Sequence, residues 1–390
     1  MSESAARAEY ERLRTWFIEA ALPLWSTAAV DRVHGGFFEK LDRAGRPLEA
    51  PRRTRVVGRQ LYVFSTARRF GWTGPWAELV AHGLDWFRRA CLTREGLVVS
   101  TARPDGTPLD AGFDLYDHAF ALFGLAAAHE ATKDPDLAAI AARMREAMKA
   151  GWGHPIAGFE AARPRRLPLG ANPHMHMFEA AEAWAAVAPA SDVAAWRALG
   201  DEIAHLALER FVDPRSGAIR EFYDGEWRPI AGDRGRIVEP GHQFEWAWLL
   251  MRWGRSRGDA SAITAARRLV EIGETHGVDA ERGVAFAELW DDLSPKDAAT
   301  RVWPQTERIK AWAATAAGAE TADARESAFA QVAAAARGLS LFLDPDLQGS
   351  WRERMRADGT FLDEPAPTST LYHVACALDV LRQTLGADPA

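Results

Sequence analysis

The stretch Glu239-Pro-Gly-His-Gln-Phe-Glu-Trp-Ala-Trp-Leu-Leu250 predicts a turn, the first turn of a helix and then an apolar helix body. His242 and Glu245 are three residues apart and Trp246 follows His242 by one turn, so the three share one face near the helix start. For one such motif, a capped helix with a buried histidine is the safer interpretation. A near-copy at His176-Met-Phe-Glu179 indicates instead that the motif belongs to a repeat.

A glycine followed by a short apolar or alternating run recurs on both sides of this helix, at intervals of roughly 59 to 66 residues. Turn signals such as Pro104-Asp-Gly106 and Asp358-Gly359 follow several of the runs, which predicts small β-hairpins. The six runs are Gly35-Gly-Phe-Phe-Glu39, Gly96-Leu-Val-Val-Ser100, Gly158-Phe-Glu160, Gly217-Ala-Ile-Arg-Glu-Phe222, Gly283-Val-Ala-Phe-Ala-Glu288 and Gly349-Ser-Trp-Arg-Glu353.

Two helical stretches lie between each hairpin and the next. Consecutive helices with short connections pack antiparallel, so the chain predicts six helical hairpins. Closed into a ring, they form an (α/α)6 barrel, a single domain over residues 1–390 with a central cavity. An open helical solenoid is the structural competitor, while a TIM barrel would need single buried strands between single helices. The predicted helices span 54–70, 74–91, 114–132, 134–150, 174–188, 192–211, 241–257, 260–276, 303–317 and 322–343, with 5–29 and 368–385 pairing across the termini.

Unusual polar residues gather at the starts of the helices that follow the hairpins. In a closed ring these are the inner helices, and their N-terminal ends would converge on one mouth of the cavity. Helix N-termini also favour negative charge, so this mouth could stabilise an anion such as an enediolate intermediate. The residues concerned are Arg59, Asp117, His118, His174, His176, Glu179, His242, Glu245, Trp303, Gln305, Glu307, Tyr372 and His373.

Several of these residues also have a structural explanation. Arg59 could pair with a carboxylate, Asp117 could cap a helix or hold Arg59, and Trp303 could be core. His118 and His174 are interpreted as structural. The arginine runs at 52–55 and 163–166 are interpreted as solvated faces, with phosphate recognition as the minor alternative.

Bulk properties exclude several classes of function. The 390 residues carry a formal net charge of −7 and a pI near 5.9, which argues against a nucleic-acid surface. Two cysteines in apolar contexts make a disulfide framework unlikely and favour a cytoplasmic protein. The N-terminal residues do not resemble a secretory signal, and no apolar run approaches the roughly 20 residues of a membrane span.

Cofactor and metal motifs are also missing from the sequence. His174-x-His176 and two His-x-x-Glu pairs could ligate a metal, but there is no His-Glu-x-x-His and no cysteine pair at zinc spacing. Neither a glycine-rich phosphate loop nor a serine nucleophile elbow is present. We therefore expect an acid–base site without metal or cofactor.

Taken in order, these motifs resemble the N-acylglucosamine 2-epimerase superfamily, which includes cellobiose 2-epimerases and mannose-type aldose–ketose isomerases. The resemblance runs from Gly35-Gly-Phe-Phe38 to Tyr372-His373 and implies an (α/α)6 barrel. It implies His242 and His373 as the acid–base pair. Together with the helix-start pattern, it makes these the expected substrate-binding residues: Arg59, Asp117, His176, Glu245, Trp303, Gln305, Glu307 and Tyr372.

One departure from the family pattern bears on the substrate. Cellobiose epimerases carry a tryptophan five residues before the last histidine, where this chain has Thr368. This weakens the disaccharide interpretation and favours a monosaccharide, as in the mannose isomerase branch. A homodimer is expected from the resemblance alone.

The expected reaction is the interconversion of an aldose and a ketose of the D-mannose/D-fructose type through an enediolate. Imidazoles with pKa values near neutrality suit the proton transfers at C2 and C1. His373 is the expected base and His242 the partner at C1 and O1, although the two roles could be exchanged. Arg59 and His176 would stabilise the enediolate oxygens, and Glu245 would orient an imidazole. A sugar 2-epimerase is the alternative, and a non-isomerising α/α-toroid protein a third.

Overall fold

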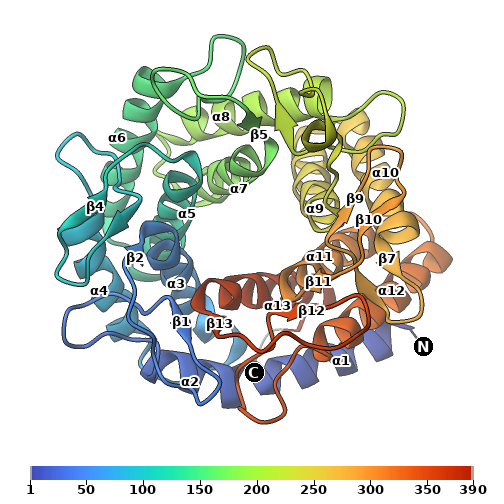
Figure 1. Ribbon diagram of the computed structural model, residues 1–390, viewed down its shortest axis with the longest axis horizontal. Helices are drawn as coiled ribbons and strands as arrows, with labels where there is room; N and C mark the ends of the chain where they lie inside the picture. Colours follow the sequence, from blue (N-terminus) through green and yellow to red (C-terminus); the bar gives the residue numbers. More distant parts are fainter. Residues whose placement is uncertain (1, 388–390) are drawn as a thin grey trace.

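Twelve principal helices form two concentric layers in the computed structural model, which describes residues 2–387 (Figure 1). The inner layer contains α3 Thr54–Ala67, α5 Leu115–Thr132, α7 Ala171–Val187, α9 Pro240–Arg257, α11 Val302–Ala317 and α13 Leu371–Leu385. The outer layer contains α1 Ser2–Trp16, continued by α2 Leu22–Thr27, then α4 Trp76–Trp86, α6 Pro135–Trp152, α8 Val193–Leu206, α10 Ala260–Gly277 and α12 Ala322–Ser340.

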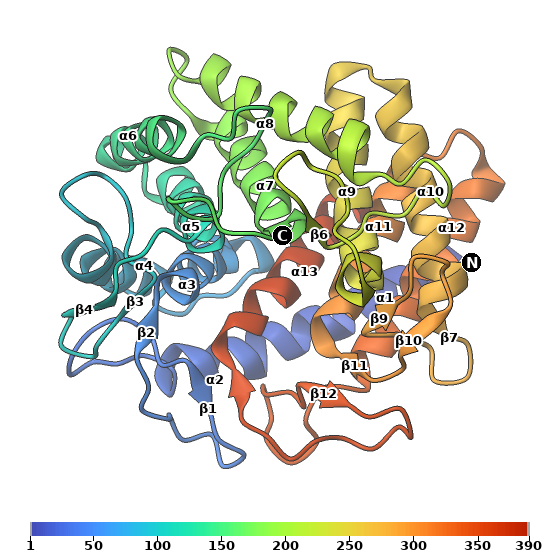
Figure 2. The same ribbon diagram turned by 45° about the horizontal axis from the view of Figure 1, so that its top comes forward.

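Each inner helix packs against the next one along the chain, and α13 packs against α3, so the inner layer closes on itself. The (α/α)6 barrel expected from the repeat is therefore confirmed, and the open solenoid is excluded. Outer helices α1, α4 and α8 end in single π-helical segments, at Phe17–Ala21, Phe87–Cys91 and Ala207–Phe211. The view in Figure 2 shows the long connections gathered at one end of the ring.

The repeat glycines mark sharp turns. All six (Gly35, Gly96, Gly158, Gly217, Gly283 and Gly349) have φ between 70° and 98°. This left-handed conformation favours glycine because a Cβ would clash with the backbone. Isolated bridges such as Leu92↔Val98 and Val212↔Ile219 span these turns. The recurring glycine in the sequence is thus a backbone requirement of the turn.

The strands are only two or three residues long and pair antiparallel. Pairs within one connection are β3 Thr101–Ala102 with β4 Pro108–Asp110, β7 Val278–Asp279 with β8 Val284–Ala285, and β9 Glu288–Leu289 with β10 Pro295–Asp297. Pairs joining different connections are β1 Lys40–Leu41 with β13 Ala366–Pro367, β2 Arg52–Arg53 with β3, β5 Leu169–Gly170 with β6 Phe222–Tyr223, and β11 Thr300–Arg301 with β12 Arg354–Met355.

The expected hairpins are thus only part of the strand pairing, because strands entering the inner helices pair with the following repeat. The β1–β13 pair matches Leu41 with Ala366 and joins the two ends of the chain. This pair closes the ring on the hairpin side, and the packing of α13 on α3 closes it in the helical layer.

The inner helices α3 and α5 cross at glycine. A Cβ on Gly58 would lie 2.1 Å from the carbonyl oxygen of Phe120, and one on Gly124 would lie 2.3 Å from that of Gly58. Only glycine permits this approach, which brings Arg59 on α3 against Tyr116 and Phe120 on α5. Within residues 2–387, no helix combines the length and apolar character that crossing a membrane requires.

Candidate active site

A cavity of about 180 Å³ opens at the mouth where the inner helices begin. Every inner helix contributes to it at or just before its N-terminal turns, together with the strand that precedes α11. The lining residues are Arg59, Tyr116, Asn172, His176, Glu239, His242, Glu245, Arg301, Trp303, Ser369, Thr370 and His373. The convergence expected from the repeat is therefore observed.

A larger cavity of about 340 Å³ lies among the C-terminal ends of the inner helices. Aromatic and alanine side chains such as Phe123, Ala127 and Trp248 line much of it, and it has no histidine in its lining. The residue types suited to proton transfer near neutral pH therefore belong to the smaller cavity.

His242 is held as a cation by carboxylates from outside its own helix. Its Nδ1 lies 3.0 Å from Glu221 Oε1 and 3.6 Å from Glu239 Oε2. Burial alone would lower the pKa of His242, but these two carboxylates outweigh it and raise the pKa to about 10. Burial in turn raises the pKa of Glu239 to about 7, against the attraction of His242. His242 is thus an imidazolium at neutral pH and can donate a proton.

His373 has the opposite electrostatic environment. Its Nδ1 lies 2.8 Å from Glu307 Oε1. Burial lowers the pKa of His373 well below its ordinary value, and the positive charges of Arg59 and Lys310 lower it further. A neutral His373 that donates from Nδ1 to Glu307 keeps an unprotonated Nε2, which is the requirement for a base.

Trp303 lies beside both histidines. Its ring centroid is 5.0 Å from that of His242 and 5.8 Å from that of His373. Gly241 makes room for this ring, since a Cβ there would lie 2.5 Å from it. Trp303 therefore lines the cavity and fixes the relative positions of the two imidazoles.

Arg59 is a buried guanidinium with no carboxylate at ion-pair distance in the part of the chain that the structure describes. One Nη donates to the Tyr116 hydroxyl at 2.7 Å, and Cζ lies 4.0 Å from the Phe120 ring centroid. Its Nε has no hydrogen-bond partner among the described residues. A buried cation on an aromatic bed, facing a cavity, is suited to bind an anion.

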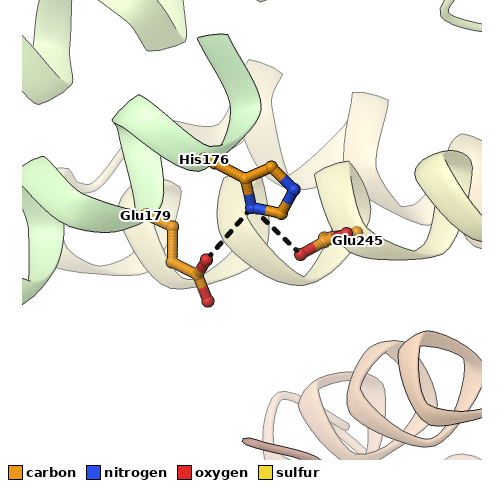
Figure 3. A group of neighbouring side chains, drawn as sticks. All are labelled: His176, Glu179 and Glu245. Atoms are coloured by element: carbon orange, nitrogen blue, oxygen red, sulfur yellow. Dashed lines mark hydrogen bonds and ion pairs between the residues drawn. The ribbon is translucent and has the colours of Figure 1, made fainter. Parts of the chain in front are cut away.

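His176 stands between two glutamates, one on its own helix α7 and one on α9 (Figure 3). Its Nδ1 lies 3.4 Å from Glu179 Oε2 and 3.8 Å from Glu245 Oε1. Glu245 is buried, and neither of its carboxylate oxygens has a hydrogen-bond partner in the described residues. Because Glu245 also lines the cavity, its carboxylate can accept a hydrogen bond from a ligand hydroxyl.

The structure places four of the expected substrate-binding residues away from the cavity lining. Asp117 binds Arg55, not Arg59: Arg55 Nε donates to Asp117 Oδ1 at 2.7 Å. Gln305 Oε1 accepts from the Ala285 backbone N–H at 2.9 Å, and its amide nitrogen donates to Thr300. These hydrogen bonds occupy both side chains with the protein itself, so the geometry gives no support for substrate contact.

The other two, Glu307 and Tyr372, lie beneath the cavity and act on neighbouring side chains. Glu307 binds His373, and the Tyr372 hydroxyl donates to Glu179 Oε2 at 2.5 Å. The remaining expected residues, namely Arg59, His176, His242, Glu245, Trp303 and His373, all line the cavity.

His118 and His174 have the structural role that the sequence suggested. Each accepts a hydrogen bond at Nε2 from a hairpin N–H, from Val98 at 3.1 Å and from Phe159 at 3.0 Å. Burial lowers the pKa of both histidines to about 4, so both are neutral at pH 7. Gln305 Oε1 accepts from the Ala285 N–H in the same way. A polar residue recurs at these helix starts because its side chain binds a backbone N–H of the preceding hairpin.

Sequence reasoning missed eight residues that line or support the site: Tyr116, Asn172, Glu221, Glu239, Arg301, Lys310, Ser369 and Thr370. Glu221 had a recognisable signal, because five of the six glycine runs contain a glutamate in their last two positions. Two other glutamates of these runs also bind side chains near the inner helix starts. Glu39 binds Arg53, and Glu353 binds Arg301 and Thr370, as Glu221 binds His242. Lys310 had no such signal, since a lysine in a helix is ordinarily read as exposed.

Groups of potential metal ligands occur twice among the described residues, as His176, Glu179 and Glu245 and as Glu221, Glu239 and His242. In both, the carboxylates already lie near cations or donors of the protein: Tyr372 bonds Glu179, Lys310 lies 3.6 Å from Glu245, and Glu221 pairs with His242. These contacts explain the grouping as histidine–carboxylate pairs, and we assign no metal to either.

The chain is similar to known proteins over most of its length. The family model of N-acylglucosamine 2-epimerase (GlcNAc 2-epimerase) matches residues 36–377. The chain is 48% identical over 377 residues to a protein of Rhizobium meliloti (strain 1021) named mannose-6-phosphate isomerase, covering 96% of each. It is 28% identical to the D-mannose isomerase of Thermobifida fusca, covering 91% of this chain and 89% of that one.

Solved structures show the same fold. A crystal structure of D-mannose isomerase matches with a TM-score of 0.84 at 18% identity, covering 96% of this chain and 98% of that one. The cellobiose 2-epimerase of Spirochaeta thermophila DSM 6192 also reaches 0.84, at 20% identity, covering 98% and 97%. With the family model extending over most of its length, the chain belongs to the N-acylglucosamine 2-epimerase family of sugar isomerases and epimerases.

Proposed function

We propose that this protein interconverts a monosaccharide aldose and its ketose, of the D-mannose/D-fructose type, through an enediolate formed by two histidines. The observation that carries the proposal is that two buried imidazoles face one cavity in opposite electrostatic surroundings, with carboxylates beside His242 and positive charges near His373. His242 is charged and can act as an acid, whereas His373 is neutral and can act as a base.

In the proposed reaction, His242 protonates the ring oxygen of the bound sugar and so assists ring opening. His373 Nε2 then takes the proton from C2 as the C1 carbonyl becomes an enediolate. His242 regains a proton from O1 as the ring opens and gives it back to O1 when the enediolate forms. When His373 then returns its proton to C1, the O2 hydroxyl gives its proton to His242 and the C2 ketone forms. Glu307 holds His373 in the required tautomer and stabilises its imidazolium, as a carboxylate does in a catalytic triad.

Arg59 and His176 are proposed to stabilise the oxygens of the enediolate. Arg59 has no carboxylate at ion-pair distance among residues 2–387, so its charge is available to an anion that develops in the reaction. Glu245, whose carboxylate oxygens lack hydrogen-bond partners in the described structure, is proposed to accept from a sugar hydroxyl.

The size of the cavity supports a small sugar. Its volume of about 180 Å³ lies below the range of roughly 300–1,000 Å³ that is typical of pockets for drug-sized ligands. Thr368 supplies no aromatic ring on which a second sugar unit could stack, and its hydroxyl donates to the Phe38 carbonyl oxygen. Both observations favour a monosaccharide. The name of the Rhizobium meliloti relative makes a 6-phosphorylated hexose the second substrate to test.

A 2-epimerase is the competing function. It uses the same enediolate but returns the proton to the opposite face of C2. Two histidines beside Trp303 are compatible with that outcome, and a relative in Rattus norvegicus is named N-acylglucosamine 2-epimerase. The identity of the products separates the two functions.

The test is to incubate the purified protein, pretreated with EDTA, with D-mannose and separately with D-mannose 6-phosphate, and to separate the products by chromatography. We expect fructose or its 6-phosphate. Glucose without fructose would establish an epimerase instead, and failure to convert any hexose or hexose 6-phosphate would refute both. In D2O, exchange of the proton held on His373 with solvent during the lifetime of the enediolate should place some deuterium at C1 of the ketose product.

A further inference from the structure

Lys310 is a lysine with no exposed surface, in the third turn of the inner helix α11. Its Nζ lies 2.5 Å from Glu307 Oε2 and 3.6 Å from Glu245 Oε1, and 4.0 Å from the ring centroid of Trp248. A lysine is rarely buried in full unless its charge is paired, because removing an ammonium from water costs several kcal/mol. Its position in the barrel interior therefore calls for an explanation.

Acidic groups from several helices surround this ammonium. Glu307 comes from α11, Glu245 from α9 and Glu179 from α7, and the neutral Cys376 faces it from α13. Burial would lower the pKa of Lys310, but Glu307 and Glu245 outweigh it and raise the pKa. Lys310 is thus a permanent positive charge among buried carboxyl groups.

The carboxyl group that contacts Lys310 is the one that orients the proposed base. Glu307 Oε1 accepts from His373 Nδ1 at 2.8 Å while Oε2 faces Lys310. Burial and the repulsion of Glu245 raise the pKa of Glu307, and Lys310 opposes them. Without the ammonium, the Glu307–His373 pair would hold an additional proton more tightly, whichever of the two carries it.

An additional proton on this pair would remove the base. If Glu307 were protonated and donated to Nδ1, the imidazole would carry its hydrogen on Nε2, towards the cavity. If His373 were protonated, it would have no free lone pair at all. Lys310 does not line the cavity, and its charged contacts are the carboxylates of Glu307 and Glu245. Of these two, Glu307 is the one that is bonded to His373.

We propose that Lys310 is a positioning residue whose buried ammonium holds Glu307 ready to accept from His373, and so keeps Nε2 of His373 free of its proton at neutral pH. This inference rests on the proposed role of His373 as the base. A simply structural lysine would instead affect stability and leave the titration of His373 unchanged.

The other positive charges that face His373 also oppose its protonation. Arg59 on α3, His176 on α7 and Arg301 before α11 disfavour its protonation, as Lys310 does. These residues are unchanged in a Lys310 variant, so a shift in titration can be assigned to the ammonium.

The experiment is a Lys310→Met variant, which keeps the length of the side chain and removes its charge. Two quantities are measured: the pH dependence of kcat/KM, and the titration of the His373 imidazole by NMR in the free enzyme, assigned by its loss in His373→Ala. A charge within about 4–6 Å shifts a pKa by about 1–3 units. We therefore expect the acid limb and the imidazole titration to move upward by about one pH unit or more.

Three further variants make the result specific. Lys310→Arg keeps a cation and should restore the wild-type limb at least in part. Lys149→Met removes a lysine that pairs with Glu202 at 2.6 Å between outer helices, and should shift neither titration. In a Glu307→Gln background, Lys310→Met should have much less effect on His373 than in the wild type, because the group that transmits its charge is gone.

Unchanged titration of His373 in folded Lys310→Met would overturn the proposal, as would an equal shift in the Glu307→Gln background. If Lys310→Met does not fold, the Lys310→Arg and Glu307→Gln variants decide: an unchanged His373 titration in Glu307→Gln refutes the coupling. The NMR readout needs no turnover, whereas the proposed function fails when the wild-type protein makes no product. The two failures are therefore distinguishable.

Discussion

Glu221→Gln should lower the pKa of His242 and so reduce the difference in pKa between His242 and His373. Glu221 precedes β6 and reaches across to α9, where its Oε1 lies 3.0 Å from His242 Nδ1. Glutamine has the same shape and keeps an oxygen that can accept from Nδ1–H, so the orientation of the ring is preserved. The substitution therefore removes charge with little change in geometry.

The magnitude follows from the electrostatics of His242. Burial opposes its charge, and Glu221 is the first of the carboxylates that raise its pKa to about 10. Removal of an adjacent opposite charge lowers the pKa by about 1–3 units, at about 1.4 kcal/mol per unit. The pKa of His242 in Glu221→Gln is therefore expected between about 7 and 9, with Glu239 supplying the remaining stabilisation of the charge.

The assay is the pH profile of kcat/KM for the wild type and the variant. Because the acid form of His242 is the active one, the alkaline limb reports its pKa and should move to lower pH in Glu221→Gln. If the alkaline limb of the variant has its midpoint near pH 8, kcat/KM at pH 9 falls about tenfold and kcat/KM at pH 6.5 is nearly unchanged. The rate at low pH is an internal control for folding.

Glu226→Gln is the matched control, since Glu226 lies in the same connection and pairs with Arg228 at the surface. It should leave the alkaline limb in place. An alkaline limb that stays at its wild-type position in Glu221→Gln would refute the assignment of His242 as the acid. A limb that moves to higher pH would contradict the electrostatic argument itself.

Three further outcomes follow from the same geometry. His373→Ala should abolish turnover and the exchange of the C2 proton with solvent while leaving the thermal transition in place; turnover near the wild-type rate would remove His373 from the mechanism. Arg59→Gln should lower kcat by about 10²–10³ with a smaller effect on KM, measured by steady-state kinetics, and a change in KM alone would mean that Arg59 binds substrate without stabilising the enediolate. Gly58→Ala places a Cβ 2.1 Å from the Phe120 carbonyl oxygen and should lower the free energy of unfolding in urea by about 2 kcal/mol or more, whereas Gly151→Ala, whose Cβ meets nothing within 4 Å, should change it by less than about 0.5 kcal/mol.

Much of the architecture could be inferred from the sequence because it is local and repeated. Helix periodicity and turn glycines are properties of short segments, and the six glycines adopt the left-handed conformation that their recurrence suggested. The residues at the inner helix starts also meet where expected, because equivalent positions in a closed ring face the same mouth. The strand pairs between neighbouring repeats were not anticipated, since two-residue strands carry almost no pattern of their own.

The partners of the histidines could not be inferred in the same way. Spacing indicated Glu245 as a neighbour of His242, because residues at i and i+3 share a helix face. In the structure, Glu221 from the preceding connection binds His242, and the imidazole next to Glu245 is that of His176. Asp117 was expected either to cap a helix or to hold Arg59. It accepts from the backbone N–H and the guanidinium of Arg55 at the start of α3, and does not bind Arg59.

The sequence by itself determined the repeat, the closed (α/α)6 ring and the set of helix starts that surrounds the cavity. Each of these depends on short-range sequence preferences that recur in all six repeats. Tertiary structure alone decided which histidine is charged and which is neutral. That distinction depends on carboxylates and a buried ammonium brought within 4 Å from separate segments: Glu221 and Glu239 beside His242, and Glu307 with Lys310 beside His373. Electrostatic interactions at such distances depend on side-chain direction and burial, which no spacing along the chain encodes.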